Sequence, residues 1–236
     1  LNLKIVFRKP ITLDSIDIIT LDKLPAVAFI IPSYHEPFEV AKMTFDSTYN
    51  INYGGNREII IVDNSIKINS PDFIKWREYA NSFANKSPKI SVKFIHNKLQ
   101  GRLKPGNLDL AQKYLENSEY VIFLDIDSTL PQNLQIIEKS ILEFSQDASL
   151  GWVQFYTKST NYNFNNRTRV ISIFQNLLRA NTHFRAQGGF TLFYGHNSIW
   201  RKSCLIKLGS WFEVHRGQVM ITEDILKTVH AYNNGY

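Results

Sequence analysis

Short apolar runs alternate with amphipathic segments over most of the chain. Three runs are continuous and bounded by turn residues, as in fully buried strands, and a fourth alternates as a half-buried strand does. The expected strands cover residues 26–31, 58–62 and 120–124, with the alternating one at 90–95. Helical spacing between and after them predicts helices at residues 40–49, 73–84, 105–116 and 131–144. This order predicts an α/β fold with a mostly parallel central sheet flanked by helices.

The sequence shows no internal division. Its 236 residues contain no repeat, low-complexity segment or linker-like stretch, so we expect a single domain over residues 1–236. Residues 1–25 are an N-terminal extension in this interpretation, and their isoleucine-rich stretches could form edge strands. The chain begins at Leu1 and stops abruptly after Tyr236, so we expect a domain cut from a longer protein.

Composition excludes several classes of protein. Hydrophobic residues make up 44% and charged residues 20%, so the chain is not disordered, and its longest apolar run, Ala26–Ile31, is far shorter than the roughly 18 residues of a membrane span. One cysteine, Cys204, excludes an internal disulfide framework and suits a reducing compartment. The net charge of +6 favours an anionic partner, namely nucleotide phosphate, nucleic acid or a lipid surface.

Acidic residues follow two of the expected strands. Asp63 comes one residue after the strand at 58–62, and Asp125 and Asp127 follow the strand at 120–124. Ligands of a doubly wound sheet bind beyond the carboxyl ends of its strands, so these side chains should meet at one edge. The D-x-D spacing brings two carboxylates within reach of one hard divalent cation. One such acid alone is more often a turn former or helix cap, whereas three in this register favour a site.

Two further segments carry candidate chemistry. Residues 100–107 precede a helix, where backbone N–H groups with Arg102 and Lys104 could bind an anion, although the spacing of a Walker loop is absent and such turns are also common on surfaces. Later, Thr222 or Asp224 could simply cap the helix that follows them. The functional alternative is that Asp224 is a general base facing a cleft.

These motifs together resemble the family 2 glycosyltransferases of the GT-A fold, especially the processive branch of cellulose, chitin and hyaluronan synthases. The resemblance runs in family order from Ile30 to Tyr236. It rests on the segments IPSYHE at 31–36, IVD at 61–63, LKPGN at 103–107, DID at 125–127, WVQ at 152–154, YGHN at 194–197 with Arg201, and TED at 222–224.

The resemblance implies a donor side of the site. Pro32, Tyr34 and Glu36 would line the pocket for the base and ribose of a nucleotide sugar. Asp63 would hold the uracil or ribose side. Lys104 would approach the diphosphate.

It also implies the catalytic and acceptor sides. Asp125 and Asp127 would bracket the donor, with Asp127 the direct ligand of Mg²⁺ or Mn²⁺. Asp224 would be the base that deprotonates the acceptor hydroxyl. The acceptor side would comprise Gln154, His196, Asn197 and Glu223.

The implied function is that of an inverting, metal-dependent hexosyltransferase that moves a sugar from a UDP- or GDP-sugar to a growing polysaccharide or glycoconjugate. It would act at the cytoplasmic face of the cell membrane as part of a longer membrane protein, associate with the membrane through segments outside this chain, and bind no nucleic acid. Two alternatives are a non-processive transferase acting on a lipid or small acceptor, and a non-catalytic domain that binds a nucleotide sugar.

The chain departs from the family pattern at three places. Asn64 stands where a second acid is frequent, and His196 stands where a small residue is common. The Gln-x-x-Arg-Trp signature of processive enzymes is absent from this chain.

Some features have an ordinary structural interpretation. Residues 167–185 combine an apolar stripe with arginines; core packing is favoured for this helix over a membrane surface, although the processive relatives strengthen the membrane alternative. The six histidines show no zinc spacing. Trp152 is expected in the core, with Trp200 and Trp211 left open between packing and sugar stacking, and Cys204 is expected as an inert residue of an apolar helix at 199–208.

Overall fold

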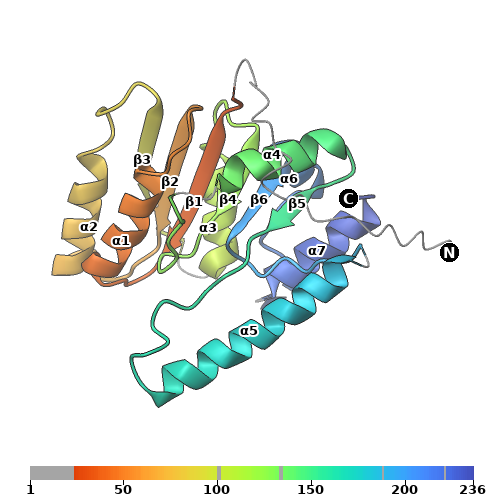
Figure 1. The fold of residues 1–236 in the computed structure, drawn as a ribbon. Coiled ribbons are helices and arrows are strands. Elements are labelled where there is room, and N and C mark those ends of the chain that lie inside the picture. Colours follow the sequence, from red (N-terminus) through yellow and green to blue (C-terminus); the bar gives the residue numbers. More distant parts are fainter. Residues whose placement is uncertain (1–23, 100–101, 133–134, 188, 221) are drawn as a thin grey trace.

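The computed structural model describes residues 24–99, 102–132, 135–187, 189–220 and 222–236. These residues form a six-stranded sheet with helices on both faces, beside a two-stranded ribbon (Figure 1). The sheet order is β3-β2-β1-β4-β6-β5. The expected α/β fold with a mostly parallel sheet is confirmed. The candidate edge strands fall on residues 1–23 and lie outside the described part of the chain.

The four predicted strands are the parallel part of the sheet. They are β1 (Val27–Ser33), β2 (Arg57–Asp63), β3 (Ile90–His96) and β4 (Tyr120–Phe123). The sequence did not reveal the remaining strands, which are very short: β5 (Trp152–Gln154) and β6 (Ser198–Arg201) extend the sheet in antiparallel pairing, and β7 (Val214–His215) pairs with β8 (Gln218–Val219).

The helix expected over residues 199–208 is wrong in its first part. Ile199 and Trp200 belong to β6, pair with β4 and are fully buried, and only then does α6 (Lys202–Leu208) begin. A short apolar run has the same pattern in a buried strand as in a buried helix, so periodicity could not separate the two.

The other helices match the expected segments to within a few residues. They are α1 (Phe38–Tyr49), α2 (Pro71–Asn81), α3 (Leu103–Gln112), α4 (Ile136–Gln146), α5 (Asn166–Gln187) and α7 (Glu223–Asn233). In α3 the proline at position 105 lies in the first turn, where its missing N–H leaves no hydrogen bond unmade.

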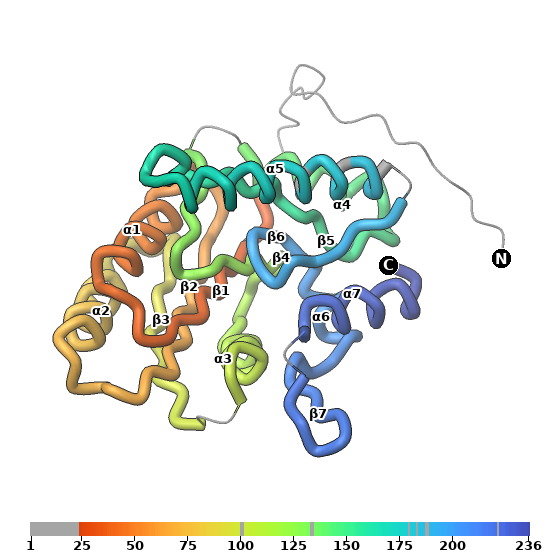
Figure 2. The backbone as a smooth tube through the Cα atoms, turned by 90° about the horizontal axis from the view of Figure 1, so that it is seen from below, coloured from red at the N-terminus to blue at the C-terminus, as the bar shows by residue number. Residues whose placement is uncertain are grey.

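The sheet divides the core into two layers, because successive side chains of a strand point to opposite faces. Phe29, Ile31 and Ile61 pack on one face with buried residues of α1, α2 and α4. Ile30 and Ile60 pack on the other face with buried residues of α3, α6 and α7. Figure 2 shows these two groups of helices on opposite sides of the strands. Burial of each such side chain contributes about 1.5–3 kcal/mol, which holds the strand ends in fixed positions.

The tryptophans and the cysteine are core residues. Trp152, Trp200 and Trp211 are all buried, which confirms the expectation for Trp152 and assigns the other two to packing. Cys204 is fully buried, and burial raises the pKa of its thiol to about 12, so it is the inert residue that was expected.

The sheet opens where β1 and β4 separate. β1 stays paired with β2 up to Ser33, whereas β4 pairs with β1 only from Val27 to Ile30. Pro32 lies in the part of β1 that pairs with β2 but no longer with β4, so no backbone donor is required on the β4 side. Here the order of strands reverses direction, the position at which α/β sheets bind ligands.

Helix α5 does not pack in the core, so the expectation of core packing is wrong. Most of its large apolar side chains are exposed, among them Val170, Phe174, Leu177 and Phe184. No helix among the described residues is both long enough and apolar enough to cross a lipid bilayer.

Candidate functional site

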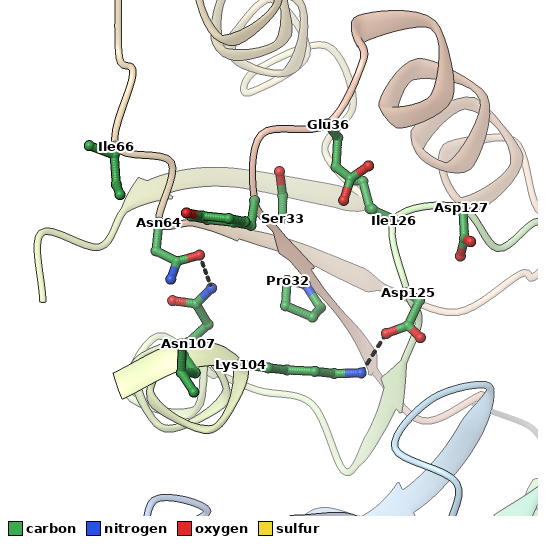
Figure 3. Close-up of a pocket in the computed structure, with 12 residues that line it drawn as sticks. Pro32, Ser33, Glu36, Asn64, Ile66, Lys104, Asn107, Asp125, Ile126 and Asp127 are labelled. Atoms are coloured by element: carbon green, nitrogen blue, oxygen red, sulfur yellow. Dashed lines mark hydrogen bonds and ion pairs between the residues drawn. The ribbon is translucent and has the colours of Figure 1, made fainter. Parts of the chain in front are cut away.

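A cavity of about 590 Å³ lies at the opening between β1 and β4 (Figure 3). Its walls come from the end of β1, the loop after β2, the first turns of α3 and the loop after β4. The lining residues are Pro32, Ser33, Tyr34, Glu36, Asn64, Ile66, Leu103, Lys104, Asn107, Asp125, Ile126 and Asp127. Of the residues expected to bind a nucleotide sugar or a metal, the structure therefore gathers Pro32, Tyr34, Glu36, Lys104, Asp125 and Asp127 around one space.

Asp63 lies beneath this cavity and does not line it. Its side chain is 1% exposed, accepts a hydrogen bond from the Ser33 hydroxyl at 2.5 Å and another from the Ser65 backbone N–H at 2.7 Å. Both carboxylate oxygens thus accept hydrogen bonds that link the end of β2 to β1 and to the loop after β2. The direct contact with a base or ribose that was expected of Asp63 stays a prediction.

A chain of buried amides fixes α3 against the end of β2. Asn97 donates to Asn107 at 2.9 Å, and Asn107 donates to the Asn64 side chain at 3.0 Å and to the Val62 carbonyl at 3.3 Å. Sequence reasoning assigned no role to Asn107 and treated Asn64 only as a departure from the family. Asn107 is the last residue of the LKPGN motif, which was the feature of the sequence that could have pointed to it, and in the structure it is 2% exposed.

Lys104 extends from α3 across the cavity to the loop after β4. Its ammonium donates to Asp125 Oδ1 at 2.5 Å, and the other oxygen of Asp125 lies 3.2 Å from His196 Nδ1 (Figure 3 shows the lysine pair). Arg102, the other candidate of the anion segment, is exposed and lies over the Phe212 ring at 5.0 Å. Lys104 is therefore the cation that the fold directs into the cavity.

The start of α7 approaches the same lysine. A methyl group placed on Gly195 would lie 3.4 Å from Asp224 Oδ2 and 3.7 Å from Lys104 Nζ, so the two charged groups border one point. Thr222 occupies the N-cap position of α7 but forms no side-chain capping hydrogen bond, whereas Asp224 Oδ1 accepts a hydrogen bond from the Ile225 backbone N–H in the first turn at 2.8 Å. Glu223 is 7% exposed and lies near Lys104, Asp125 and Asp224.

The carboxylates of the site affect one another electrostatically. Burial, together with the negative charges of Asp127, Asp63 and Asp125, raises the pKa of Glu36. Burial likewise raises the pKa of Glu223, which the nearby Lys104 partly offsets. We call Glu36, Asp63, Asp125, Asp127, Glu223 and Asp224 the acidic cluster.

The expected acceptor residues form and surround a tight turn. Gln154 donates to the carbonyls of His196 and Asn197, both at 2.9 Å, and accepts from the Tyr194 N–H at 3.1 Å. The amide of Gln154 is thus used to hold the turn. Asn197 is buried and donates to Thr157, so it lies away from the cavity.

A second, smaller cavity of about 210 Å³ lies between β5, this turn and α5. Its wall is formed by Gln154, Phe155, Tyr156, Thr157, Gln175, Leu178, Thr182, Tyr194 and His196. His196 therefore contacts Asp125 of the first cavity and lines the second one.

Among the described residues, positive φ angles at residues other than glycine occur in the segments of the site and also elsewhere, at Gln135 and Arg216. Positive φ values occur at His35 (55°), Leu103 (50°) and Asn197 (49°), each within or beside a segment that supplies a site residue. A positive φ costs conformational free energy for any residue other than glycine, and residues held in this conformation occur preferentially at functional sites in proteins.

The carboxylates of the site suit a cation that is bound partly by the protein and partly by the phosphate oxygens of a ligand. No group of three or more His, Cys, Asp or Glu side chains in the described ranges is arranged to bind a metal on its own. Asp125 is engaged by Lys104 and His196, while Asp127 makes no side-chain hydrogen bond or ion pair with another described residue. A hard cation commonly uses one or two carboxylates and completes its shell with phosphate oxygens and water, which fits Asp127.

Comparison with solved structures finds the same fold in S. aureus TarS. S. aureus TarS 1–349 superposes with a TM-score of 0.59 at 15% sequence identity, over 89% of this chain and 56% of that one. Its complex with UDP-GlcNAc superposes with a TM-score of 0.56 at 15% identity, over 89% and 54%. The chain thus spans little more than half the length of these relatives.

Sequence comparison identifies the family. Residues 28–209, well over half of the chain, match the model of glycosyl transferase family 2. The matched range contains the whole lining of the first cavity and the 194–197 turn. The chain belongs to glycosyl transferase family 2.

Proposed function

We propose that this chain is the donor-binding and catalytic domain of an inverting glycosyltransferase that uses a UDP- or GDP-sugar and a divalent cation. One observation carries the proposal: Lys104 of α3 pairs with Asp125 in the donor cavity, and its ammonium and the Asp224 carboxylate of α7 both lie close to Gly195. Residues far apart in sequence thus place an anion-binding lysine and a candidate base at one site.

The donor cavity has the components that a nucleotide diphosphate needs. Tyr34 is exposed at its mouth, and a planar base can stack on such a ring, while Pro32 and Ile66 supply apolar walls. The Lys104 ammonium can bind phosphate oxygens and stabilise the negative charge that develops on the leaving diphosphate. The TarS complex with UDP-GlcNAc supports the choice of a nucleotide sugar as the ligand class.

Charge balance supports a divalent cation, Mg²⁺ or Mn²⁺. The acidic cluster presents many carboxylates around one lysine, so a diphosphate entering alone would meet net repulsion. Asp127 would hold the ion, which when bound would polarise the diphosphate and stabilise its departure. The pKa of Glu36 is raised first by burial and then by the negative charges of Asp127, Asp63 and Asp125.

Asp224 would act as the base. It would accept the proton of the acceptor hydroxyl as that oxygen forms a bond to the anomeric carbon and the bond from that carbon to the diphosphate oxygen breaks. Attack opposite the leaving group inverts the anomeric configuration. Burial raises the pKa of the neighbouring Glu223 carboxyl, which is 7% exposed, so Asp224 is the residue of this pair that we assign as the base.

The second cavity would receive the acceptor, because it shares His196 with the donor side and lies along the Gln154-supported turn. The expected acceptor is a polysaccharide or glycoconjugate. Membership of the processive branch, and a location at the cytoplasmic face of the membrane within a longer protein, stay predictions.

Calorimetry with UDP and Mn²⁺ tests the donor assignment. Asp127→Asn should weaken Mn²⁺-dependent UDP binding by at least about tenfold, because the cation loses its protein carboxylate. Asp224→Asn should retain UDP binding while transfer from a UDP-sugar stops. Glu78→Gln, an exposed acid of α2, is the matched control and should bind UDP as the parent chain does.

Two results would contradict the proposal. Unchanged UDP affinity of Asp127→Asn in Mn²⁺ would remove the metal assignment. Loss of UDP binding in Asp224→Asn would show that this residue supports the fold or the donor and is not the base.

A further inference from the structure

Helix α5 has the opposite polarity to an ordinary surface helix. A helix on a soluble domain turns its apolar stripe toward the core and its polar residues outward. Of the α5 side chains that the structure describes, Ser172 and Thr182 are the buried ones, and Thr182 shares a hydrogen bond of 2.6 Å with the Tyr194 hydroxyl. Ser172 and Thr182 therefore lie on the side of α5 that faces the domain.

The outward face of α5 is a continuous apolar strip. Counted from Val170, the next three positions lie three, four and seven residues further on, which places them on one face of the helix. Phe184 lies two turns after the last of them on the same face. The strip comprises Val170, Ile173, Phe174, Leu177 and Phe184, all of them exposed. Figures 1 and 2 both place α5 along the outside of the domain, and among the described residues it makes no broad contact with another helix or strand.

The charged residues of α5 favour an anionic surface as the binding partner of this face. The 22 residues of α5 include no Asp or Glu, and exposed arginines flank the strip at Arg167, Arg169 and Arg185. An apolar face bordered by arginines, without acids, is the pattern of a helix that lies in the interface of an anionic bilayer. There the arginines meet lipid phosphates while the apolar side chains enter the region of the acyl chains.

A second copy of the chain fits this face less well. A symmetric contact would set the same helix face against itself and bring arginines close to arginines. No acidic residue of the helix could then neutralise them.

We propose that the outward face of α5 docks this domain on an anionic membrane surface. The second cavity lies directly under this helix, since Gln175, Leu178 and Thr182 contribute to its wall. Docking through α5 would therefore hold that cavity next to the lipid headgroups. The attachment belongs to the domain itself and needs no transmembrane segment.

Flotation with lipid vesicles tests the proposal on the chain of 236 residues. The chain should float with vesicles of phosphatidylcholine containing phosphatidylglycerol and stay behind with phosphatidylcholine alone. Molar salt should reduce the bound fraction, because it screens the arginine contribution. The double variant Phe174→Gln and Leu177→Gln should abolish flotation, and Arg167→Gln with Arg185→Gln should weaken partitioning on the order of tenfold.

Matched controls separate the helix from general surface properties. Ile206 is 68% exposed on α6, close to the 64% of Leu177, so Ile206→Gln should float as the parent chain does. Lys75→Gln with Lys113→Gln changes the net charge as the arginine pair does, at exposed sites on α2 and just after α3, and should also float normally.

Several results would overturn the proposal. It fails if the parent chain ignores anionic vesicles, or if the control variants lose flotation as far as the α5 variants do. It also fails if the parent chain forms a dimer that Leu177→Gln disperses, because the face would then bind a second copy. Circular dichroism of each variant shows whether a loss of flotation reflects unfolding.

Discussion

A buried lysine holds the helix that carries the candidate base. Lys227 of α7 is 2% exposed, and its ammonium donates to the carbonyls of Leu208, Gly209 and Ser210 at 3.4, 3.1 and 2.6 Å. It thereby closes the end of α6 and fixes α7 one turn after Asp224. Burial lowers the pKa of Lys227, because removing the ammonium from water disfavours its charged form.

Lys227→Met removes the ammonium while keeping the length of the side chain. Hydrogen bonds from a charged donor contribute about 1.5–3 kcal/mol each, and the carbonyls would stay buried without a donor. The relief of desolvation offsets part of this loss. We expect the free energy of unfolding to fall by about 2–4 kcal/mol, which is a fall in Tm of about 5–15 °C for a domain of this size.

Thermal and urea unfolding followed by circular dichroism measure this change. Lys207→Met is the matched control, because Lys207 is exposed on α6, where it donates to the Asn234 carbonyl and lies over the Tyr236 ring, so we expect a change below about 1 kcal/mol. If Lys227→Met unfolds within about 2 °C of the parent chain, the reasoning is refuted, since three buried carbonyls would then not need the ammonium. In the folded variant, kcat should fall more than UDP affinity, because α7 carries Asp224.

Three other predictions follow from single contacts. Glu58→Gln should cost about 2–4 kcal/mol in urea unfolding, since the buried carboxylate accepts four hydrogen bonds from residues 116–118 and an amide would turn one oxygen into a donor. Gly195→Ala should cost about 1–2 kcal/mol and lower kcat, because φ is 78° there and the methyl group would meet Asp224. The pKa of Glu36 is raised in the folded chain, so its contribution to stability is present below pH 4.5 and is lost as the pH rises through the raised value. The free energy of unfolding, measured from pH 4 to pH 8, should therefore decrease over this range, and Glu36→Gln should remove that decrease.

Each of these has a specific control. Gly217→Ala shares a φ of 78° but meets nothing within 4 Å, so it isolates backbone strain and should leave kcat unchanged. Glu78→Gln serves as the exposed counterpart of Glu58→Gln. Equal effects in variant and control, or a pH slope that persists in Glu36→Gln, would contradict the corresponding prediction.

The long parallel strands and the residues at their ends could be predicted from sequence. A run such as residues 58–62 is buried on both faces and ends in polar residues, so both the strand and the acid after it are visible in the pattern. For the same reason Asp125 and Asp127, which come just after β4, could be placed at this edge of the sheet from the sequence, whereas Lys104 was identified from the segment before a helix and from the family resemblance.

Other features depend on contacts that no local pattern contains. The strand β6 begins an apolar run that continues into a helix, so only its pairing with β4 separates the two. The burial of Asp63 depends on Ser33, which lies in the neighbouring strand. The outward orientation of α5 was missed because periodicity locates an apolar stripe on a helix but does not say whether a core exists on that side.

The pairing of Lys104 with Asp125 has a consequence for the order in which substrates arrive. A pyrophosphate entering the cavity would compete with Asp125 for the ammonium and leave that carboxylate to His196, which belongs to the 194–197 turn. Gly195 of the same turn lies close to Asp224, whose Oδ2 is 3.4 Å from the position that a β-carbon would take there. A nucleotide sugar that arrives first would thus rearrange the surface on which the second substrate lands, and steady-state kinetics should follow a compulsory sequence with the nucleotide sugar leading.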